Sequence, residues 1–494
     1  MMNASDTPKS ARPAQPGSPN GGSITKRAAL VLALWLGFWL LALGLVAGLL
    51  WIPVAQTAYR GSLQFSGVLA GLAGLTLAWS LRPRRRDTTG DKTTPPLSRE
   101  SAAPLYAMVE RIGAGLGINA PVNIHLVGQS TAFISSKRTW YGKVRSLEVG
   151  LGLPLLGTMS EAELGSVIAH EFGHFVAGDL SLGPWVYRTR IAIARTVTDL
   201  DDSMFFLDLL FKAYGKLFLR LSASVSRAQE FAADSAARQV FGARDTANAL
   251  KKVHLLAPVW AAYFELELVP ALCHGARLPI FEGFRQCRAS VNRRAEVQAA
   301  IRQGEAHTVS EYDTHPGLDE RLAALSAGEL PQFPPLADSF ALLGGAAATE
   351  QAWYALFPQE EAVDCDWPGF GPEVLQKRVA ERFAGSWMDP AQMPLAQLLP
   401  MAGDLDGLWL RLRPEGVSFL SRQGKRNHVS AILKDWIIAS LAARGFAALV
   451  QPGQALMMRR GGQQVEPDEL ISAALAATLT AERLAQFDAA ASVA

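Results

Sequence analysis

Cysteine is scarce in this chain of 494 residues, which contains only Cys273, Cys287 and Cys365. Three cysteines cannot form a disulfide framework, and their low, odd number favours a reducing compartment. Cys273 and His274, with Cys287 further along, do not have the spacing of a known zinc site, so we assign no second metal there.

Charged residues are also sparse, because they make up 19% of the sequence and sum to a net charge of +2. A protein that binds nucleic acid normally carries a pronounced basic stripe, so no nucleic-acid partner is predicted. The length of the chain favours about three domains.

Two long runs, residues 28–52 and 61–81, contain no charged residue at all. Each is long enough to cross a bilayer, which takes about 20 apolar residues. We therefore predict a transmembrane helical hairpin over residues 26–86. A signal peptide is the alternative for the first run, but its apolar region would be shorter and would end in a small-residue cleavage site.

Basic residues flank the outer ends of this hairpin, with Lys26 and Arg27 before it and four arginines within residues 82–86 after it. The positive-inside rule then places both termini, and everything after residue 82, in the cytoplasm. We expect a multi-pass protein of the inner (plasma) membrane. Residues 1–25 contain few large apolar side chains and are predicted to form a flexible tail.

The clearest chemical signal lies in residues 160–174. Ser160 and Glu163 form a capping box, which predicts that a helix begins there. His170 and His174 would then lie one turn apart on one face, with Glu171 beside them. This H-E-x-x-H spacing is typical of zinc hydrolases, in which the glutamate acts as the base. The alternative is a chance occurrence on an ordinary helix.

A hydrolytic zinc site needs a third protein ligand and one open position for water. Residues 226–234 provide a second helical segment, on which Glu230 and Asp234 share a face. We predict that one Zn²⁺ is bound by His170, His174 and Glu230. Asp234 is expected to accept the far ring N–H of one ligand histidine and so to fix its tautomer.

These blocks resemble the M48 membrane zinc metallopeptidases, a family that includes the heat-shock protease HtpX and the CaaX prenyl proteases. The resemblance covers roughly residues 100–330 and depends on three motifs in the family's order: Ala169–His174 followed by Gly178 and Asp179, Ser226-Arg227 leading to Glu230 and Asp234, and Thr314-His315-Pro316 followed by Arg321. It implies a mainly helical gluzincin-type core with a small β-sheet, expected here over residues 101–335.

The resemblance also implies roles for residues outside the zinc ligands. His315 is expected to stabilise the oxyanion, with Arg321 supporting charge nearby. Thr314 and Pro316 are equally typical of a helix N-terminus. The family's Asn-Ala-Phe strand, to which substrate adds, corresponds to Thr131, Ala132 and Phe133, with threonine in place of the usual asparagine. A plain core role is the alternative for these strand residues.

The interval between the two ligand helices departs from the heat-shock proteases, which have two further membrane spans there. Four charged residues recur at every fourth position within residues 204–222: Asp208, Lys212, Lys216 and Arg220. Such a stripe predicts an amphipathic helix. The helix would pack within the protein, over the active-site cleft, or lie on the membrane surface.

The remaining sequence predicts short elements. In the peptidase region we expect a helix at residues 101–116, strands at 122–127, 131–134 and 145–156, and a hairpin tip at 135–143. Residues 87–100 and 336–369 read as linkers. Residues 370–494 are expected to form an α+β accessory domain with strands at 407–412 and 416–422, a helix at 429–443, and a hairpin of 447–451 with 455–460.

Together these observations predict a membrane-anchored zinc metalloendopeptidase that hydrolyses misfolded or membrane-associated polypeptides. A scaffold with a purely structural zinc, a CaaX-type processing protease and another H-E-x-x-H hydrolase such as a deformylase are the alternatives. Glu171 disfavours the scaffold, because a structural site needs no base. The expected partners are a polypeptide substrate and the lipid bilayer; the sequence does not indicate an oligomeric state.

Overall fold

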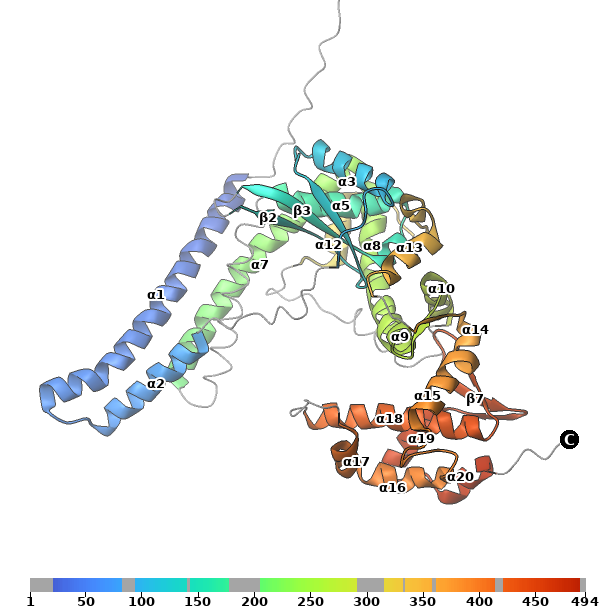
Figure 1. The fold of residues 1–494 in the computed structure, drawn as a ribbon. Coiled ribbons are helices and arrows are strands. Elements are labelled where there is room, and N and C mark those ends of the chain that lie inside the picture. The colour runs from blue at the N-terminus through green and yellow to red at the C-terminus, as the bar shows by residue number, and fades with distance from the viewer. Residues whose placement is uncertain are drawn as a thin grey trace, which may run out of the picture. The chain divides into compact units, whose positions relative to one another are not determined.

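The structure, a computed structural model, is dominated by helices (Figure 1). It describes residues 21–81, 94–139, 143–176, 205–290, 315–331, 334–357, 361–413 and 421–488. The chain divides into two compact units. Unit 1 contains residues 1–91, 173–236 and 309–324, whereas unit 2 contains residues 92–172, 237–308 and 325–494.

Unit 1 begins with two apolar helices, α1 (Gly21–Arg60) and α2 (Phe65–Leu81). The part of α1 from Leu32 to Arg60 is long and apolar enough to cross a membrane, and α2 contains a shorter apolar stretch, Phe65–Trp79. Residues 21–25, expected in the flexible tail, already belong to α1, because no helix breaker separates them from the apolar run. Residues 1–20 of that tail lie outside the described residues.

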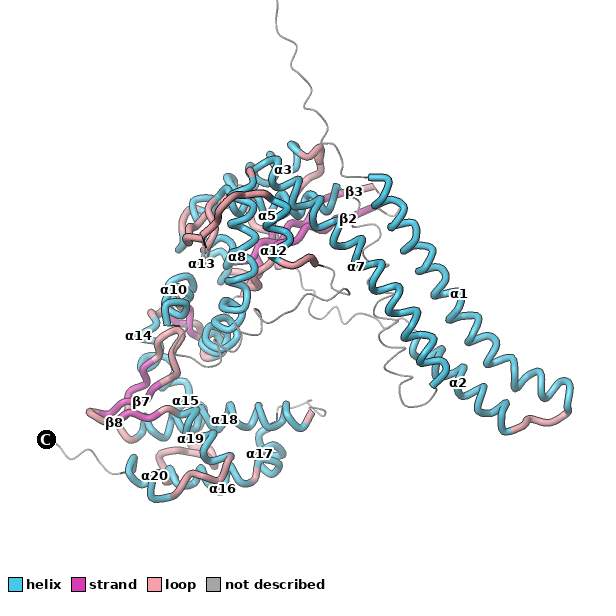
Figure 2. Tube along the Cα trace, turned by 180° about the vertical axis from the view of Figure 1, so that it is seen from behind, coloured by secondary structure: helices cyan, strands magenta, loops and turns pink. Residues whose placement is uncertain are grey.

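The predicted amphipathic helix forms the first half of α7 (Phe205–Phe241), and its apolar side is covered by α1 and α2. Figures 1 and 2 both show the three helices side by side. One buried cluster joins residues of all three: Phe38, Ala42, Leu77, Leu81, Phe218 and Val225. The Tyr214 hydroxyl also donates a hydrogen bond to the carbonyl oxygen of Leu34.

The opposite side of α7 carries Lys216 and Arg220, both of which are exposed. The side chains of Asp208 and Lys212 lie outside the described residues. In the described part of α7, therefore, the charged stripe and the buried apolar stripe occupy different sides, as an amphipathic helix requires. The helix packs within the protein, and its partner in unit 1 is the apolar hairpin.

Unit 2 contains a three-stranded sheet of order β1-β3-β2, formed by β1 (Val122–Val127), β2 (Ala132–Arg138) and β3 (Val144–Gly152). β3 runs parallel to β1 and antiparallel to β2. The strands alternate, so that one face of the sheet is apolar and buried: Val122, Ile124, Leu126, Ile134, Leu147, Val149 and Leu151. Strand β2 continues to Arg138, past the expected start of the hairpin tip, and β3 ends before helix α4 (Leu153–Leu156).

Helices fill most of the rest of unit 2. They are α3 (Ala103–Gly115), α5 (Glu161–Val176, shared with unit 1), α8 (Ala243–Tyr263), a π-helical turn (Phe264–Leu268), α9 (Val269–Cys273) and α10 (Ile280–Ser290). Helix α12 (Leu318–Leu325) belongs almost entirely to unit 1. Helices α8 and α9, taken together, are long and apolar enough to cross a membrane. However, Trp260 and Tyr263 are fully buried there, which is typical of a core helix.

The linker prediction for residues 336–369 is wrong. This segment contains a 3-10 turn (Phe340–Leu343), α13 (Ala346–Tyr354), β5 (Val363–Asp364) and α14 (Trp367–Gly369), and β5 pairs with β4 (Ala276–Arg277). Trp353 and Trp367 are buried, and the Trp367 indole N–H donates to the carbonyl of Pro279. These aromatic side chains provide the apolar surface that fixes the segment.

The C-terminal region follows part of the expected pattern. Of the strand predicted at residues 416–422, residues 416–420 lie outside the described part of the chain, and Arg422 begins a helix. Helix α18 (Arg422–Ala443) and the antiparallel pair of β6 (Ala447–Leu449) with β7 (Met457–Arg460) confirm two predictions. The strand predicted at residues 407–412 is wrong, because they belong to helix α17 (Leu405–Leu412), whose start is capped by Asp404. The remaining elements are a π-helical turn (Phe370–Leu375), α15 (Gln376–Phe383), a 3-10 turn (Leu395–Gln397), α16 (Leu398–Gly403), β8 (Gln463–Val465), α19 (Pro467–Leu475) and α20 (Ala481–Asp488).

The predicted capping box at the start of α5 is present. The Ser160 amide donates to the Glu163 carboxylate at 2.8 Å, and the Glu163 amide donates to the Ser160 hydroxyl at 3.3 Å. The ammonium of Lys252 on α8 lies 2.7 Å from the same carboxylate and donates to the carbonyl of Thr158 at 2.9 Å. The Lys252 side chain is fully buried, so this ion pair fixes where helix α5 begins.

We expect Lys252→Met to destabilise unit 2 by about 3 kcal/mol, since removing one partner leaves the buried Glu163 carboxylate unpaired. The neighbouring substitution Lys251→Met is the control, because Lys251 makes a single exposed hydrogen bond to Pro331. Chemical unfolding of both variants measures the difference. Equal midpoints for the two variants would contradict the structural role given to Lys252.

Candidate metal centre

Helix α5 presents the two predicted histidine ligands from a rigid base. Leu164, Ile168 and Phe172 are fully buried and hold the helix in place. His170 and His174 lie one turn apart and are half-buried, so their rings are accessible to an ion. Glu171 follows His170 directly and is also half-buried.

The third predicted ligand comes from α7, which crosses the end of α5 at Gly173. A side chain at Gly173 would place its Cβ 2.9 Å from the Cα of Ala233, so only glycine permits this close approach. Glu230 lies almost one turn before Ala233. One carboxylate oxygen of Glu230 is 3.7 Å from Nε2 of His174, and its side chain is buried.

The three predicted ligands converge. One ligand atom each from His170, His174 and Glu230 lies within 4.8 Å of the others. Two imidazoles and one carboxylate are the donor set of catalytic zinc sites that keep an open position for water. The residues therefore fit the metal that the sequence predicts.

Arg321 and His315 surround the Glu230 carboxylate. Arg321 on α12 is buried and lies 3.1 Å from one Glu230 oxygen. It also donates two hydrogen bonds to Asp234, at 2.8 and 2.7 Å. Nδ1 of His315, whose side chain is 69% exposed, lies 2.8 Å from the other Glu230 oxygen. Thr314, the predicted helix cap, lies outside the described residues.

Sequence reasoning missed the pairing of Arg321 with Asp234. The signal for this pairing was available in the sequence. Glu230 and Asp234 share one face of a helix, and Arg321 is a cation that could bind both carboxylates. The contact of Asp234 with a ligand histidine stays a prediction, as does the oxyanion role of His315.

The predicted substrate strand lies at the start of β2, which is an edge strand of the sheet. Thr131 accepts a hydrogen bond from the Gly152 amide at 2.8 Å, and Ala132 begins the strand. The Phe133 ring covers Gly150 on β3 so closely that a side chain at Gly150 would clash with it. Phe133 nevertheless remains 37% exposed, so it is not a plain core residue.

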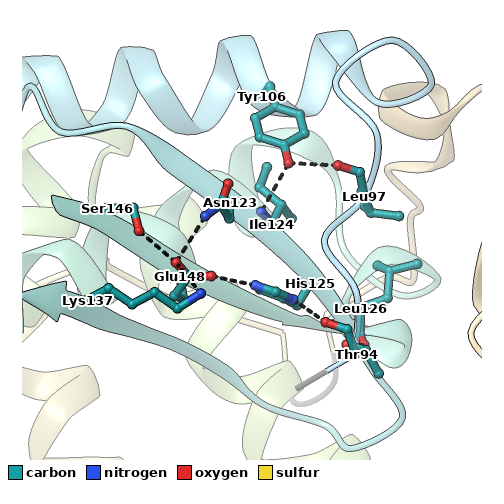
Figure 3. Close-up of polar contacts among 10 residues, drawn as sticks. All are labelled: Thr94, Leu97, Tyr106, Asn123, Ile124, His125, Leu126, Lys137, Ser146 and Glu148. Atoms are coloured by element: carbon teal, nitrogen blue, oxygen red, sulfur yellow. Dashed lines mark hydrogen bonds and ion pairs between the residues drawn. The ribbon is translucent and has the colours of Figure 1, made fainter. Parts of the chain in front are cut away.

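The sheet face opposite the apolar core carries a buried polar network (Figure 3). The His125 ring lies 2.8 Å from the Glu148 carboxylate through Nε2 and 2.6 Å from the Thr94 carbonyl through Nδ1. Asn123 and Ser146 donate hydrogen bonds to Glu148 at 3.0 and 2.8 Å. Lys137 on β2 lies 3.1 Å from the same carboxylate.

Burial alone would raise the pKa of Glu148. The hydrogen bonds from His125, Asn123, Ser146 and Lys137 outweigh burial and lower that pKa from 4.5 to about 2. Glu148 is therefore a buried carboxylate that stays ionised at neutral pH and ties all three strands together.

The crossing helices, with two histidines and a glutamate, define a candidate metallohydrolase centre, and comparison with known proteins gives the family. Residues 102–329 match the model of peptidase family M48. Among solved structures, the crystal structure of S. mikatae Ste24p is similar at 15% identity, with 60% of this chain and 67% of that chain covered and a TM-score of 0.26. A search of the curated proteins found no matching relative.

We expect Gly173→Ala to weaken zinc binding roughly tenfold or more, because the added methyl group would push α7, and with it Glu230, away from His174. Zinc affinity is measured by competition with a chromophoric chelator. Gly115→Ala is the control, since nothing lies within 4 Å of a side chain added at that position. Unchanged zinc affinity in Gly173→Ala would contradict the role of this helix crossing.

The low pKa of Glu148 has a testable consequence for stability. A carboxylate with a pKa below its ordinary value stabilises the fold above pH 4.5, and this contribution is lost as the pH falls towards about 2. It amounts to about 3 kcal/mol. In the Glu148→Gln variant, the free energy of unfolding should therefore not fall in this way as the pH is lowered. The control variant Glu100→Gln, at an exposed position, should show the same fall as the wild type. Parallel curves for wild type and Glu148→Gln between pH 4.5 and 2 would contradict the account.

Proposed function

We propose that this protein is a membrane-anchored zinc endopeptidase in which His170, His174 and Glu230 hold the metal and Glu171 is the catalytic base. The single observation that carries this proposal is the convergence of the three ligand atoms within 4.8 Å, next to an intact glutamate on the same helix. The M48 family match supports peptidase chemistry.

The proposed chemistry divides between the metal and the chain. Bound zinc would lower the pKa of water towards neutrality and polarise a carbonyl group. Glu171 takes the proton of the attacking water and delivers it to the departing amine. This role requires a carboxylate beside the metal ligands, and Glu171 directly follows His170.

The residues around Glu230 position the site. Arg321 holds the carboxylates of Glu230 and Asp234 in one arrangement, since it contacts both. His315 lies on the exposed side of Glu230, with its Nδ1 2.8 Å from one carboxylate oxygen and its side chain 69% exposed, so it faces the side from which a substrate would enter. We assign oxyanion stabilisation to His315 and positioning of the glutamate ligand to Arg321.

The substrate would bind as an extended strand. Among the strands of the described residues, β2 pairs only with β3, so its outer edge offers backbone groups to a peptide. We assign this contact to the stretch Thr131, Ala132 and Phe133. Hydrogen bonds to the peptide backbone depend little on the side chains of the substrate, so this binding mode suits cleavage of unfolded segments.

The apolar helices α1 and α2 support anchorage in a bilayer. The basic residues that flank this hairpin in the sequence favour the cytoplasmic side of the inner membrane for the peptidase. In unit 1, α7 packs on this hairpin through Phe218 and Val225 and carries Glu230 less than two turns further along. About 1.5 Å of rise per residue places Glu230 only about 8 Å beyond Val225 along the helix. The glutamate ligand is thus held close to the anchor, which suits cleavage of membrane-associated polypeptides.

We assign residues 101–335 to the peptidase domain and residues 370–494 to an accessory region. No function is assigned to the accessory region.

Glu171→Gln is the direct test of the proposed reaction. We expect roughly a 10²–10⁴-fold loss of casein hydrolysis, because the variant lacks the general base while its ligand set is intact. Zinc content, measured on the same preparations, should equal that of the wild type.

Glu161→Gln is the matched control, since Glu161 is an exposed glutamate in the first turn of the same helix. It should retain full hydrolysis. Equal proteolysis by wild type and Glu171→Gln would remove the proposed base. Zinc in both proteins with hydrolysis in neither would favour a scaffold with a structural metal.

A further inference from the structure

The end of the β2–β3 hairpin carries an unusual concentration of positive charge. Residues 111–147 contain no aspartate or glutamate, but they contain five lysines and arginines. Four of these lie at the hairpin end: Lys137, Arg138, Lys143 and Arg145. All four are exposed, and the Lys137 side chain is 65% exposed. We call these four residues the basic hairpin end.

Backbone pairing holds the two arms of the basic hairpin end together. Arg138 lies opposite Val144, and the Thr139 amide donates to the Lys143 carbonyl at 2.8 Å. The cations therefore come from both arms and flank the hairpin end on two sides. Trp140 and Tyr141, aromatic residues of the predicted tip, lie outside the described residues.

The polar network ties the basic hairpin end to the start of the domain. Lys137 is bound to Glu148, Glu148 to His125, and His125 to the carbonyl of Thr94 (Figure 3). Thr94 is the first described residue after α2. The side chains of His125 and Glu148 thus connect Thr94, where the described chain reaches the sheet, with Lys137 of the basic hairpin end.

The covalent chain also limits how far this region can lie from the end of α2. Twelve residues, 82–93, separate Leu81 from Thr94. Even a fully extended chain spans at most about 3.6 Å per residue, or about 45 Å here. Thr94 contacts His125, which pairs with Gly150, so the hairpin end at Val144 lies about 20 Å further along β3. The chain thus keeps the basic hairpin end within about 65 Å of the end of α2.

We propose that the basic hairpin end docks on the anionic lipid headgroups of the membrane in which α2 is anchored. The four cations and the ionised Glu148 carboxylate leave a net charge of +3, which complements a negatively charged bilayer surface. Docking would hold the sheet, with its open β2 edge, at the bilayer surface. This inference rests on the bilayer anchorage proposed above and is independent of the peptidase chemistry.

An acidic polypeptide is the other partner that a basic surface would fit. A strand added to the open edge of β2 would run beside Lys137 and Arg138, whereas Lys143 and Arg145 belong to the β3 arm, and β3 is the central strand. The cations therefore surround the hairpin end instead of following the open edge. This arrangement favours a broad charged surface over a bound strand.

Hydrogen exchange of the full chain in lipid nanodiscs tests the proposal. Peptides covering residues 132–152 should exchange several-fold more slowly in phosphatidylcholine mixed with phosphatidylglycerol than in phosphatidylcholine alone. The combined variant Arg138→Gln, Lys143→Gln and Arg145→Gln should lose this protection. Each cation near an anionic surface contributes about fivefold to binding, so three removals weaken docking roughly 10²-fold. High salt should have the same effect, because it screens exposed charges.

The control variant is Lys377→Gln, Arg422→Gln and Arg426→Gln, which removes three exposed cations of the C-terminal region and should retain the protection. Equal exchange in the two lipids, or protection that persists in the hairpin variant, overturns the proposal. Protection by inorganic phosphate in phosphatidylcholine alone overturns it in favour of a small-anion site. Because exchange is followed without substrate, these results do not depend on whether the protein cleaves peptides.

Peptide hydrolysis in uncharged detergent separates lipid from substrate as the partner. Wild type and the hairpin variant should cleave acidic and neutral peptides with the same ratio of kcat/KM. A selective loss with the acidic peptide overturns lipid docking and identifies the basic hairpin end as a substrate contact. An inactive wild type with lipid-dependent protection would refute the proposed function and leave the docking intact.

Discussion

The close crossing of α5 and α7 at Gly173 is the constraint on which the candidate centre depends. Helices usually pack 8–10 Å apart, and the distance depends on the side chains between them. Here glycine leaves the Cα of Ala233 in contact with α5, which brings the Glu230 carboxylate to the ring of His174. Arg321 then holds Glu230 from its other side. A larger side chain at residue 173 would separate ligands that the sequence places 56 residues apart.

Helix α7 carries both the contact with the apolar hairpin and the candidate ligand Glu230. Phe218 and Val225 pack against the apolar hairpin, and Glu230 and Asp234 follow on the same helix. Because both contacts belong to one helix, the hairpin helps to fix where Glu230 lies. The charged stripe with Lys216 and Arg220 stays exposed on the other side of the same helix.

The sequence points to the candidate histidine ligands because their signals are local. The spacing of His170 and His174 and the capping box of Ser160 with Glu163 each depend on one helix. The partner of α7 and the ion pair of Lys252 with Glu163 depend on contacts between distant segments, which periodicity does not report. Residues 336–369 read as a linker because they follow the proline-rich stretch 330–335 and a shift in composition, whereas Trp353 and Trp367 in fact contribute buried surface. At residues 407–412, alternating apolar residues outweighed the Asp404 cap, which is the signal for the helix that forms.

X-ray absorption at the zinc edge of the purified full chain tests the central claim most directly. Two imidazoles and one carboxylate predict scattering from two histidine rings, with nitrogen and oxygen neighbours at about 2.0–2.2 Å and no sulfur. A shell containing sulfur at about 2.3 Å would assign the metal to the cysteines, and fewer than two imidazoles would exclude the pair His170 and His174. Either result would contradict the metal centre described for α5 and α7.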